Sequence, residues 1–373
     1  MVEERVALGR IGQNAIFGVK FVVEVSGKTA MRPVLVVAVI MSTLFAAAAC
    51  GGKEHAAKKP DPAAVLLSHM TTEQKVGQLF VARVFGDGLN ASSKTNTATF
   101  GDGVDTPAKA VVRYNPGGII YFRADGNLVN PQQTAGFSNG LQQVAADSGA
   151  QIPLLISTDQ ENGIIDRLRA PATVLPGGMA LGSSYLGGKA AGKSPNDAAA
   201  DARLAAEITA QELRAMGINT DHAPIADVNT NPANPVIGVR SPSADPDIAS
   251  ELVSEQVKGL QSAGKSSLGV SATAKHFPGH GDTSVDSHTG IPVVNINHHE
   301  WSRVAAPPFR AAIKAGVDSI MTAHIIMPQL DPSGNPATLS KPILTGLLRK
   351  ELGFKGVVFT DSLEMKGVRD KYG

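Results

Sequence analysis

The feature that most constrains the fold is a repeated alternation of short apolar segments with segments of helical spacing. Seven apolar segments predict strands, and they lie at residues 78–85, 117–122, 153–159, 219–228, 272–276, 318–324 and 356–361. Helical spacing occurs before and between them, at residues 66–77, 131–148, 197–216, 247–263, 297–315 and 342–352. Short continuous apolar strands between helices are typical of a parallel sheet that is buried on both faces. Seven repeats favour an α/β fold of the TIM (β/α)8-barrel type over a doubly wound sheet.

Composition excludes several classes of protein. A chain that is 43% hydrophobic and 18% charged is too apolar to be wholly disordered. The formal net charge of +1 argues against a nucleic-acid binder, so we expect no nucleic-acid partner. One cysteine excludes an intrachain disulfide framework and a cysteine-rich metal site. The sequence contains neither a glycine-rich dinucleotide fingerprint nor a P-loop, and we expect no cofactor.

The N-terminal region reads as targeting sequence. Residues 34–49 form an apolar run that is shorter than the ~20 residues needed to span a membrane. Met31 and Arg32 precede the run, and small residues end it before Cys50, which is the order of a secretory signal peptide. The stretch Ala47–Cys50 resembles a bacterial lipobox, although an ordinary signal peptide with an incidental cysteine is an alternative. We therefore expect a mis-assigned extension at 1–30 and a lipoprotein signal peptide at 31–49. Cys50 would carry a lipid anchor on the outer face of the cell membrane. A tether would follow at 50–64, and one globular domain would span 65–373.

Polar and charged residues collect where the predicted strands end. They are Asp159, Asp221, His222, Lys275, His276, His324 and Asp361. Barrel enzymes carry their catalytic groups at the carboxyl ends of the strands. Because buried charges need partners, packing alone does not explain five strands that end this way. The pattern predicts a functional site at this edge of the sheet.

The densest group of reactive side chains lies in residues 275–292, KHFPGHGDTSVDSHTGIP. Three interpretations are open. A metal site could use the imidazole and carboxylate groups of His276, His280, Asp282, Asp286 and His288. A hydrolase could instead use Asp286 and His288 as a proton-transfer pair, in which the carboxylate raises the basicity of the imidazole and fixes its tautomer. The third interpretation is a solvated polar loop in which His280 and Asp282 only shape the backbone.

This loop resembles the signature of bacterial β-N-acetylhexosaminidases of glycoside hydrolase family 3. Three further segments match family motifs in the family's order, namely PLLISTDQENG at 153–163, NPVIGVRS at 234–241 and VVFTDSLEM at 357–365. The resemblance implies a TIM barrel and a retaining mechanism with two chemical steps. It also implies a carbohydrate substrate, in particular peptidoglycan fragments (muropeptides) that bear a terminal N-acetylglucosamine, and we expect a monomer.

The resemblance implies a role for each matching residue. Asp361 takes the place of the nucleophile that forms a glycosyl-enzyme, and Asp286 with His288 takes the place of the acid/base pair. Most retaining glycosidases use two carboxylates ~5–5.5 Å apart, so a histidine would here replace one of them. The residues that match sugar contacts are Asp159, Arg167, Arg240, Lys275 and His276. The resemblance assigns no metal.

The chain departs from the family pattern at two places. The usual Gly-Gly-Arg after the Asp-Gln-Glu triplet is here Asn162, Gly163 and Ile164, and Asn tolerates the left-handed backbone better than most residues. The chain also ends at Gly373, soon after Asp361, which predicts a barrel without its eighth strand and closing helix. An open barrel exposes strand edges, so the alternative function is a non-catalytic or impaired sugar-binding surface lipoprotein.

Overall fold

A computed structural model describes residues 61–372, except 263, 265–267 and 289. The predicted signal peptide, Cys50 and nearly all of the predicted tether lie outside the described residues. The first helix begins at Pro62, so the last residues assigned to the tether are helical and the folded domain starts before residue 65. Within the described ranges, no helix has the length and apolar character needed to cross a membrane.

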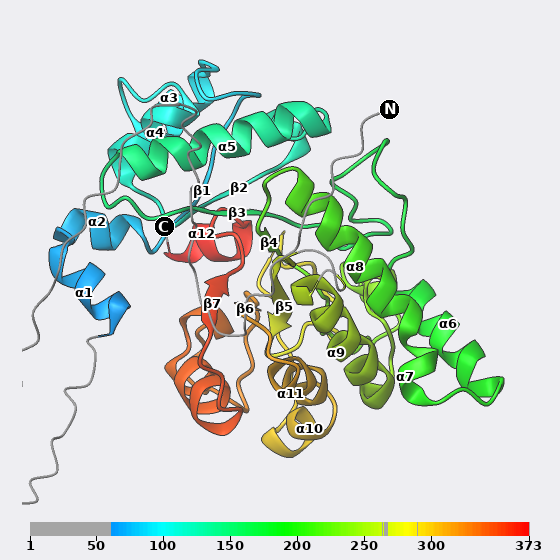
Figure 1. Ribbon diagram of the computed structural model, residues 1–373. Coiled ribbons are helices and arrows are strands. Elements are labelled where there is room, and N and C mark those ends of the chain that lie inside the picture. The colour runs from blue at the N-terminus through cyan, green and yellow to red at the C-terminus, as the bar shows by residue number, and fades with distance from the viewer. Residues whose placement is uncertain (1–60, 263, 265–267, 289, 373) are drawn as a thin grey trace, which may run out of the picture. The chain divides into compact units, whose positions relative to one another are not determined.

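Seven parallel strands form the sheet, and each pairs with the next one along the chain (Figure 1). They are β1 (Val81–Arg83), β2 (Gly118–Ile120), β3 (Leu155–Thr158), β4 (Thr220–Asp221), β5 (Ser271–Phe277), β6 (Ser319–Thr322) and β7 (Val357–Thr360). Among the residues that the structure covers, no ladder joins β1 to β7. The sheet is that of an incomplete TIM-type barrel, which confirms the predicted fold class.

Helices connect the strands and cover the sheet (Figure 1). The α-helices are α1 (Pro62–His69), α2 (Thr72–Gly77), α3 (Lys94–Phe100), α4 (Pro107–Tyr114), α5 (Pro131–Asp147), α6 (Gly178–Ala190), α7 (Pro195–Ala198), α8 (Ala200–Ala215), α9 (Pro246–Ser262), α10 (His298–Arg303), α11 (Ala306–Lys314) and α12 (Lys366–Tyr372). A π-helix spans Pro342–Glu351, and short 3-10 turns lie at Arg123–Asp125, Gly238–Arg240 and Ala337–Leu339. Helix α9 packs against α8, α11 and β5, so the region around β5 is the most heavily covered.

Caps and prolines divide two of the helices that the sequence predicts as single. The predicted helix at 66–77 becomes α1 and α2, because Thr71 caps α2 in a reciprocal pair of hydrogen bonds with Gln74. The predicted helix at 297–315 becomes α10 and α11. Pro307 and Pro308 lie in the first turn of α11, where a missing N–H costs little.

Six of the seven described strands are shorter than the apolar segments that predicted them, whereas β5 extends one residue beyond its segment at each end. The segment at 219–228 pairs as a regular strand only at Thr220–Asp221, because Pro224 has no N–H to donate to a ladder. The remainder of that segment still contacts β5, since the N–H of Lys275 donates to the carbonyl of Pro224. Helices α3, α4, α6 and α12 were not predicted. Helix α3 is largely polar, and its N-cap Ser93 rather than an apolar stripe marks its start.

Large aromatic side chains form the core beside β5. Phe277 at the end of β5 packs edge-to-face against Trp301 of α10 and Phe309 of α11. Trp301 is fully buried, and its Nε1–H donates to the carbonyl of Pro278 at 2.9 Å. This contact ties α10 to the first residue after β5. The segment that follows therefore starts from a rigid base.

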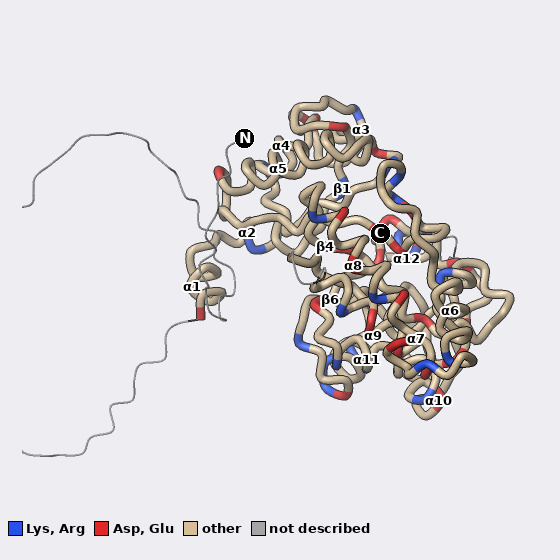
Figure 2. Tube along the Cα trace, turned by 45° about the vertical axis from the view of Figure 1, so that its right-hand side comes forward, with Lys and Arg blue, Asp and Glu red and all other residues tan. Residues whose placement is uncertain are grey.

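Charged residues of both signs are spread along the chain (Figure 2). Blue and red segments are interspersed over the described region, consistent with the net charge of +1 for the sequence. A nucleic-acid binder normally gathers basic residues on one face. Here the two signs of charge are mixed, and the charged groups of interest are the buried ones described below.

Candidate functional site

The carboxyl edge of the sheet gathers the polar residues that the sequence predicted there. Asp159 follows β3, Lys275 and His276 lie in β5, and Asp361 follows β7. Because all strands run parallel, their carboxyl ends meet at one edge. The positions on the strands are therefore as predicted, and the side-chain contacts show which residues meet.

Lys275 is the centre of a buried charge network. Its Nζ lies 2.7 Å from Oδ1 of Asp159 and 2.8 Å from Oε1 of Glu161, and only 3% of its side chain is exposed. A lone ammonium group at this depth would be very costly, so the two carboxylates stabilise it. The network brings together the ends of β3 and β5.

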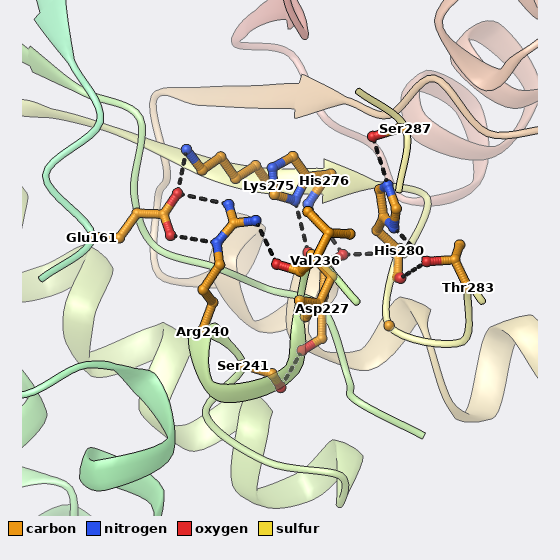
Figure 3. A network of polar contacts seen from close by, with 12 residues as sticks. Glu161, Asp227, Val236, Arg240, Ser241, Lys275, His276, His280, Thr283 and Ser287 are labelled. Atoms are coloured by element: carbon orange, nitrogen blue, oxygen red, sulfur yellow. Dashed lines mark hydrogen bonds and ion pairs between the residues drawn. The ribbon is translucent and has the colours of Figure 1, made fainter. Parts of the chain in front are cut away.

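Arg240 joins the same network from the loop after β4. Its guanidinium binds Glu161 through two parallel contacts of 2.8 Å and donates to the carbonyl of Val236 at 2.9 Å (Figure 3). The two-pronged contact fixes the plane of both groups. Arg167 lies farther out, with its Nη2 3.7 Å from Oδ2 of Asp159. Each predicted sugar-contacting arginine therefore forms a salt bridge within the site.

Burial and charge act in opposite directions on this network. Burial alone would raise the pKa of Asp159 and of Glu161. The charge and hydrogen bond of Lys275 together with Arg167 at Asp159, and the charge of Lys275 together with Arg240 at Glu161, outweigh it and lower both pKa values. Burial alone would lower the pKa of Lys275, and the two carboxylates raise it instead. All three groups are therefore ionised at neutral pH. The site presents fixed charged donors and acceptors in a water-poor environment, which suits recognition of hydroxyl groups.

Asp227 holds His276 in place. Its side chain is fully buried, and Oδ2 lies 2.8 Å from Nδ1 of His276. Burial lowers the pKa of His276 well below its usual value, so the imidazole is neutral at pH 7 and the contact is a hydrogen bond rather than an ion pair. Nδ1–H donates to the carboxylate, and Nε2 of His276 is then an acceptor. Burial also raises the pKa of Asp227 to about 6.

Asp286 and His288 contact each other on an exposed loop. Oδ1 of Asp286 accepts from the backbone N–H of His288 at 2.9 Å and lies 2.7 Å from its Nδ1. The side chain of His288 is 62% exposed and that of Asp286 is 33% exposed. Although burial tends to raise it, hydrogen bonds from His288 lower the pKa of Asp286. The pair thus exists as predicted, in a setting unlike that of the buried network.

Asp361 is half-buried at the end of β7. Its N–H donates to the carbonyl of Thr322 at 3.1 Å, and its Oδ1 accepts from the N–H of Ser362 at 2.7 Å. Its charge acts electrostatically on His276 and favours the protonated ring, although burial outweighs this effect. The carboxylate therefore lies at the edge of the sheet that also carries Asp159, Lys275 and His276.

Two further histidines lie beneath this edge. His324 is fully buried, and its Nε2–H donates to the carbonyl of Ser362 at 3.0 Å, so it supports the backbone next to Asp361. His222 is buried against Phe359 with ring centroids 5.2 Å apart, and burial lowers its pKa to about 4. Burial likewise raises the pKa of Asp221 well above its ordinary value. These residues are part of the interior that supports the site.

His280 has both ring nitrogens engaged by hydroxyl groups. Nδ1 lies 2.8 Å from Oγ1 of Thr283, and Nε2 lies 3.0 Å from Oγ of Ser287. Within the ranges that the structure describes, no three His, Cys, Asp or Glu side chains are grouped to hold a metal ion. The side chains proposed for the metal interpretation of this loop have other partners. Asp227 holds His276, Thr283 and Ser287 hold His280, Thr230 donates to Asp282, and Asp286 pairs with His288.

The first departure from the family pattern has a backbone explanation. Asn162 has φ +66° and Gly163 has φ +61°, so both adopt the left-handed conformation that Asn and Gly tolerate. A Cβ on Gly163 would lie 2.7 Å from Cα of Gly177. Ile164 points to solvent, with 68% exposure. Asn162 therefore preserves the turn that follows Asp159.

Sequence reasoning missed two residues of the site, Glu161 and Asp227. Glu161 lies two positions after Asp159, and its place in the motif at 153–163 could have identified it as a residue of the site. Asp227 lies within the predicted strand at 219–228, where an acid in an apolar segment was the signal. Their partners come from distant segments, so spacing alone did not reveal them.

The parallel sheet defines a protein of the TIM-barrel type. Its carboxyl edge carries buried cation–carboxylate pairs, the half-buried Asp361 and an exposed Asp–His pair. This set of groups suits a polar, hydroxyl-rich ligand. Residues 71–373 match the family model described as "Glycosyl hydrolase family 3 N terminal domain". The chain belongs to this family.

Similar proteins carry related descriptions. Beta-hexosaminidase A of Pseudoalteromonas piscicida is 41% identical over 275 residues, which cover 70% of this chain and 43% of that protein. The solved glycoside hydrolase family 3 beta-N-acetylglucosaminidase from Paenibacillus sp. str. FPU-7 has a TM-score of 0.71 and 44% identity, covering 82% of this chain and 51% of that one. NagZ from Neisseria gonorrhoeae, solved in complex with N-trifluoroacetyl-D-glucosamine, has a TM-score of 0.64 and 28% identity, covering 78% of this chain and 76% of that one. The chain thus spans about half the length of the first two.

Proposed function

We propose that this protein is a retaining exo-β-N-acetylglucosaminidase. The observation that carries the proposal is the half-buried carboxylate of Asp361, which directly follows β7 at the same edge of the parallel sheet as Asp159, Lys275 and His276. The buried charges of the Lys275 network are paired with one another, whereas the described contacts of the Asp361 side chain are to a backbone N–H. A carboxylate whose described contact is to a backbone N–H, beside a group of polar side chains, is placed as a nucleophile would be.

The proposed reaction divides the work between the two parts of the site. Asp159, Lys275 and His276 bind hydroxyl groups of the terminal sugar through fixed donors and acceptors. Asp361 attacks the anomeric carbon while the bond to the leaving oxygen breaks, and it forms a glycosyl-enzyme.

The pair of Asp286 and His288 provides the proton transfers. Nδ1–H of His288 donates to Asp286, so Nε2 is the atom that gives a proton to the leaving oxygen in the first step. In the second step Nε2 takes a proton from a water that attacks the anomeric carbon, while the bond from that carbon to Asp361 breaks. The carboxylate of Asp286 stabilises the imidazolium that forms in the second step. Such an acid/base group contributes about 10²- to 10⁴-fold to the rate.

The substrate that we propose is a peptidoglycan fragment with a terminal β-linked N-acetylglucosamine. The descriptions of the relatives support the sugar: one is a beta-N-acetylglucosaminidase, and another was solved with a glucosamine derivative. The muropeptide aglycone rests on the sequence resemblance. Release of N-acetylglucosamine from a purified muropeptide, compared with release from a chitin fragment of equal length, measures this preference.

The test of the activity uses 4-nitrophenyl β-N-acetylglucosaminide. Wild type releases nitrophenol, and Asp361→Ala lowers kcat by about 10⁴-fold, because an intermediate no longer forms. Proton NMR of the first product shows the β-anomer if the mechanism is retaining. Equal rates for wild type and Asp361→Ala would exclude the assigned nucleophile. Parallel reactions with and without phosphate separate hydrolysis from transfer to phosphate.

A second candidate function is sugar binding without turnover. The observation that favours it is the open sheet, in which β1 and β7 share no ladder within the described residues and nearby Leu79, Phe80 and Val357 are exposed. Open strand edges and exposed apolar side chains lower stability. Calorimetric binding of N-acetylglucosamine with no product from any of the three substrates above would support this candidate.

We also propose that Cys50 carries a lipid anchor that holds the protein on the outer face of the cell membrane. The proposal rests on the apolar run at 34–49 and the small residues before Cys50. Expression in a bacterial host with labelled palmitate should label wild type and leave Cys50→Ser unlabelled. Label in both proteins, or in neither, would contradict the anchor.

A further inference from the structure

Ser287, the residue between Asp286 and His288, is buried although both of its neighbours reach solvent. Its exposure is 2%, against 62% for the His288 side chain. Its Oγ lies 3.0 Å from Nε2 of His280 (Figure 3). The exposed proton-transfer pair is thus attached to the protein interior by the residue at its centre.

The direction of this hydrogen bond follows from its neighbours. The hydroxyl of Thr283 donates to the carbonyl of His280 at 3.0 Å, so its oxygen accepts from Nδ1–H of His280 at 2.8 Å. In the tautomer that carries its proton on Nδ1, Nε2 of His280 is an acceptor. The hydroxyl of Ser287 is therefore the donor, and the contact is a directed bond rather than a chance approach.

His280 is itself fixed by the site's interior. Its backbone N–H donates to Oδ1 of Asp227 at 2.7 Å, and Nδ2 of Asn234 donates to its carbonyl at 2.9 Å. Oδ2 of Asp227 accepts from Nδ1–H of His276. Hydrogen bonds therefore connect His276, on the sugar side, to Ser287, on the loop (Figure 3). Both the backbone and the ring of His280 are thereby held, so the position of its Nε2 is fixed where Ser287 meets it.

Packing supports the loop from the other side. A Cβ on Gly367 of α12 would lie 2.7 Å from the carbonyl oxygen of Gly290 and 3.1 Å from that of Ser287. The backbone of α12 therefore touches the loop directly, with no side chain between. At the base of the loop, by contrast, a cavity of about 200 Å³ is bordered by Gly279, Gly281 and Asp282. Hydrogen bonds, more than dense packing, hold that end.

We propose that Ser287 and His280 are positioning residues that set the placement of His288 relative to the sugar-binding residues. The bond from Ser287 anchors the segment at its midpoint, so Asp286 and His288 on either side share one fixed pivot. This inference rests on the hydrolase function proposed above. Ser287 holds the position of the loop, whereas Asp286 and His288 on either side of it transfer the proton.

The test compares two substrates that differ in their need for a general acid. Ser287→Ala should lower kcat/KM for β-linked chitobiose by about five- to tenfold, the loss expected for one hydrogen bond. It should change kcat/KM for 4-nitrophenyl β-N-acetylglucosaminide less than about twofold, because nitrophenolate leaves with little protonation. Ser284→Ala is the matched control. Ser284 is an exposed serine of the same loop, and it should match wild type on both substrates.

Equal losses on the two substrates would show a general structural effect and would overturn the positioning role, as would no loss on either. Hydrogen exchange of residues 285–292 gives a readout that does not need activity. Exchange should be faster in Ser287→Ala than in wild type and Ser284→Ala. If wild type is inert towards both substrates, the hydrolase proposal fails. Hydrogen exchange that is the same in Ser287→Ala and wild type would then also refute the role of Ser287 in holding the loop.

Discussion

The two halves of the site differ in how they are held. The side chains of Lys275, Glu161 and Arg240 are largely buried and joined by contacts of 2.8 Å, so their geometry exists before any ligand arrives. Asp286 and His288 lie on a loop, and His288 is mostly exposed. The difference teaches that the proposed sugar-binding residues are fixed by ion pairs at the edge of the sheet, while the proposed acid/base pair is exposed and is held mainly through buried Ser287 between its two members. A mutation should therefore affect either stability or activity, depending on which half it touches.

The largest expected effect separates activity from stability. His288→Ala should lower kcat by about 10²- to 10⁴-fold on a substrate with a poor leaving group, because the general acid is lost. The free energy of unfolding should change by less than about 0.5 kcal/mol, since the side chain is 62% exposed. Steady-state rates and urea denaturation measure the two quantities. His299→Ala, at a surface histidine of α10, is the control and should change neither.

The opposite result is expected in the buried half. Glu161→Ala should lower the free energy of unfolding by about 3–5 kcal/mol, because Arg240 and Lys275 lose a buried partner. Urea denaturation is the measurement. Asp105→Ala removes the partner of Lys109 in an exposed pair and should cost less than about 1 kcal/mol. Similar costs for the two variants would mean that burial does not distinguish these carboxylates.

A smaller effect should appear as pH dependence. Burial raises the pKa of Asp227 to about 6, so between pH 4 and 6 the folded protein holds a proton that the unfolded chain releases. The stability from this group is fully present below pH 4 and is lost as the pH rises through 6. Relative to Asp227→Asn, which mimics the protonated acid, wild type should lose roughly 2–3 kcal/mol over this range. Thermal or urea unfolding at several pH values measures it, and a constant difference would contradict the buried ionisation.

The sequence predicted the strands and the residues at their ends better than the side-chain contacts that these residues make. The ends of the strands placed Asp159, Lys275 and His276 at one edge, because parallel strands with apolar cores have a recognisable pattern. Glu161 and Asp227 escaped prediction because their roles depend on partners such as Arg240, which lies 79 positions from Glu161. The strand at 219–228 was predicted too long because apolar character does not reveal that Pro224 interrupts a ladder. Helices such as α6, rich in glycine and without a clear apolar stripe, gave no periodic signal.

The contact between Trp301 and Pro278 also gives this protein a built-in optical reporter. Trp301 is the sole tryptophan of the sequence, so all indole emission comes from one buried ring. Its Nε1–H is bonded to the backbone where the loop that carries Asp286 and His288 departs from β5. A shift in emission wavelength on adding a ligand would therefore localise a change to the root of that loop. No label and no engineered fluorophore would be needed to observe it.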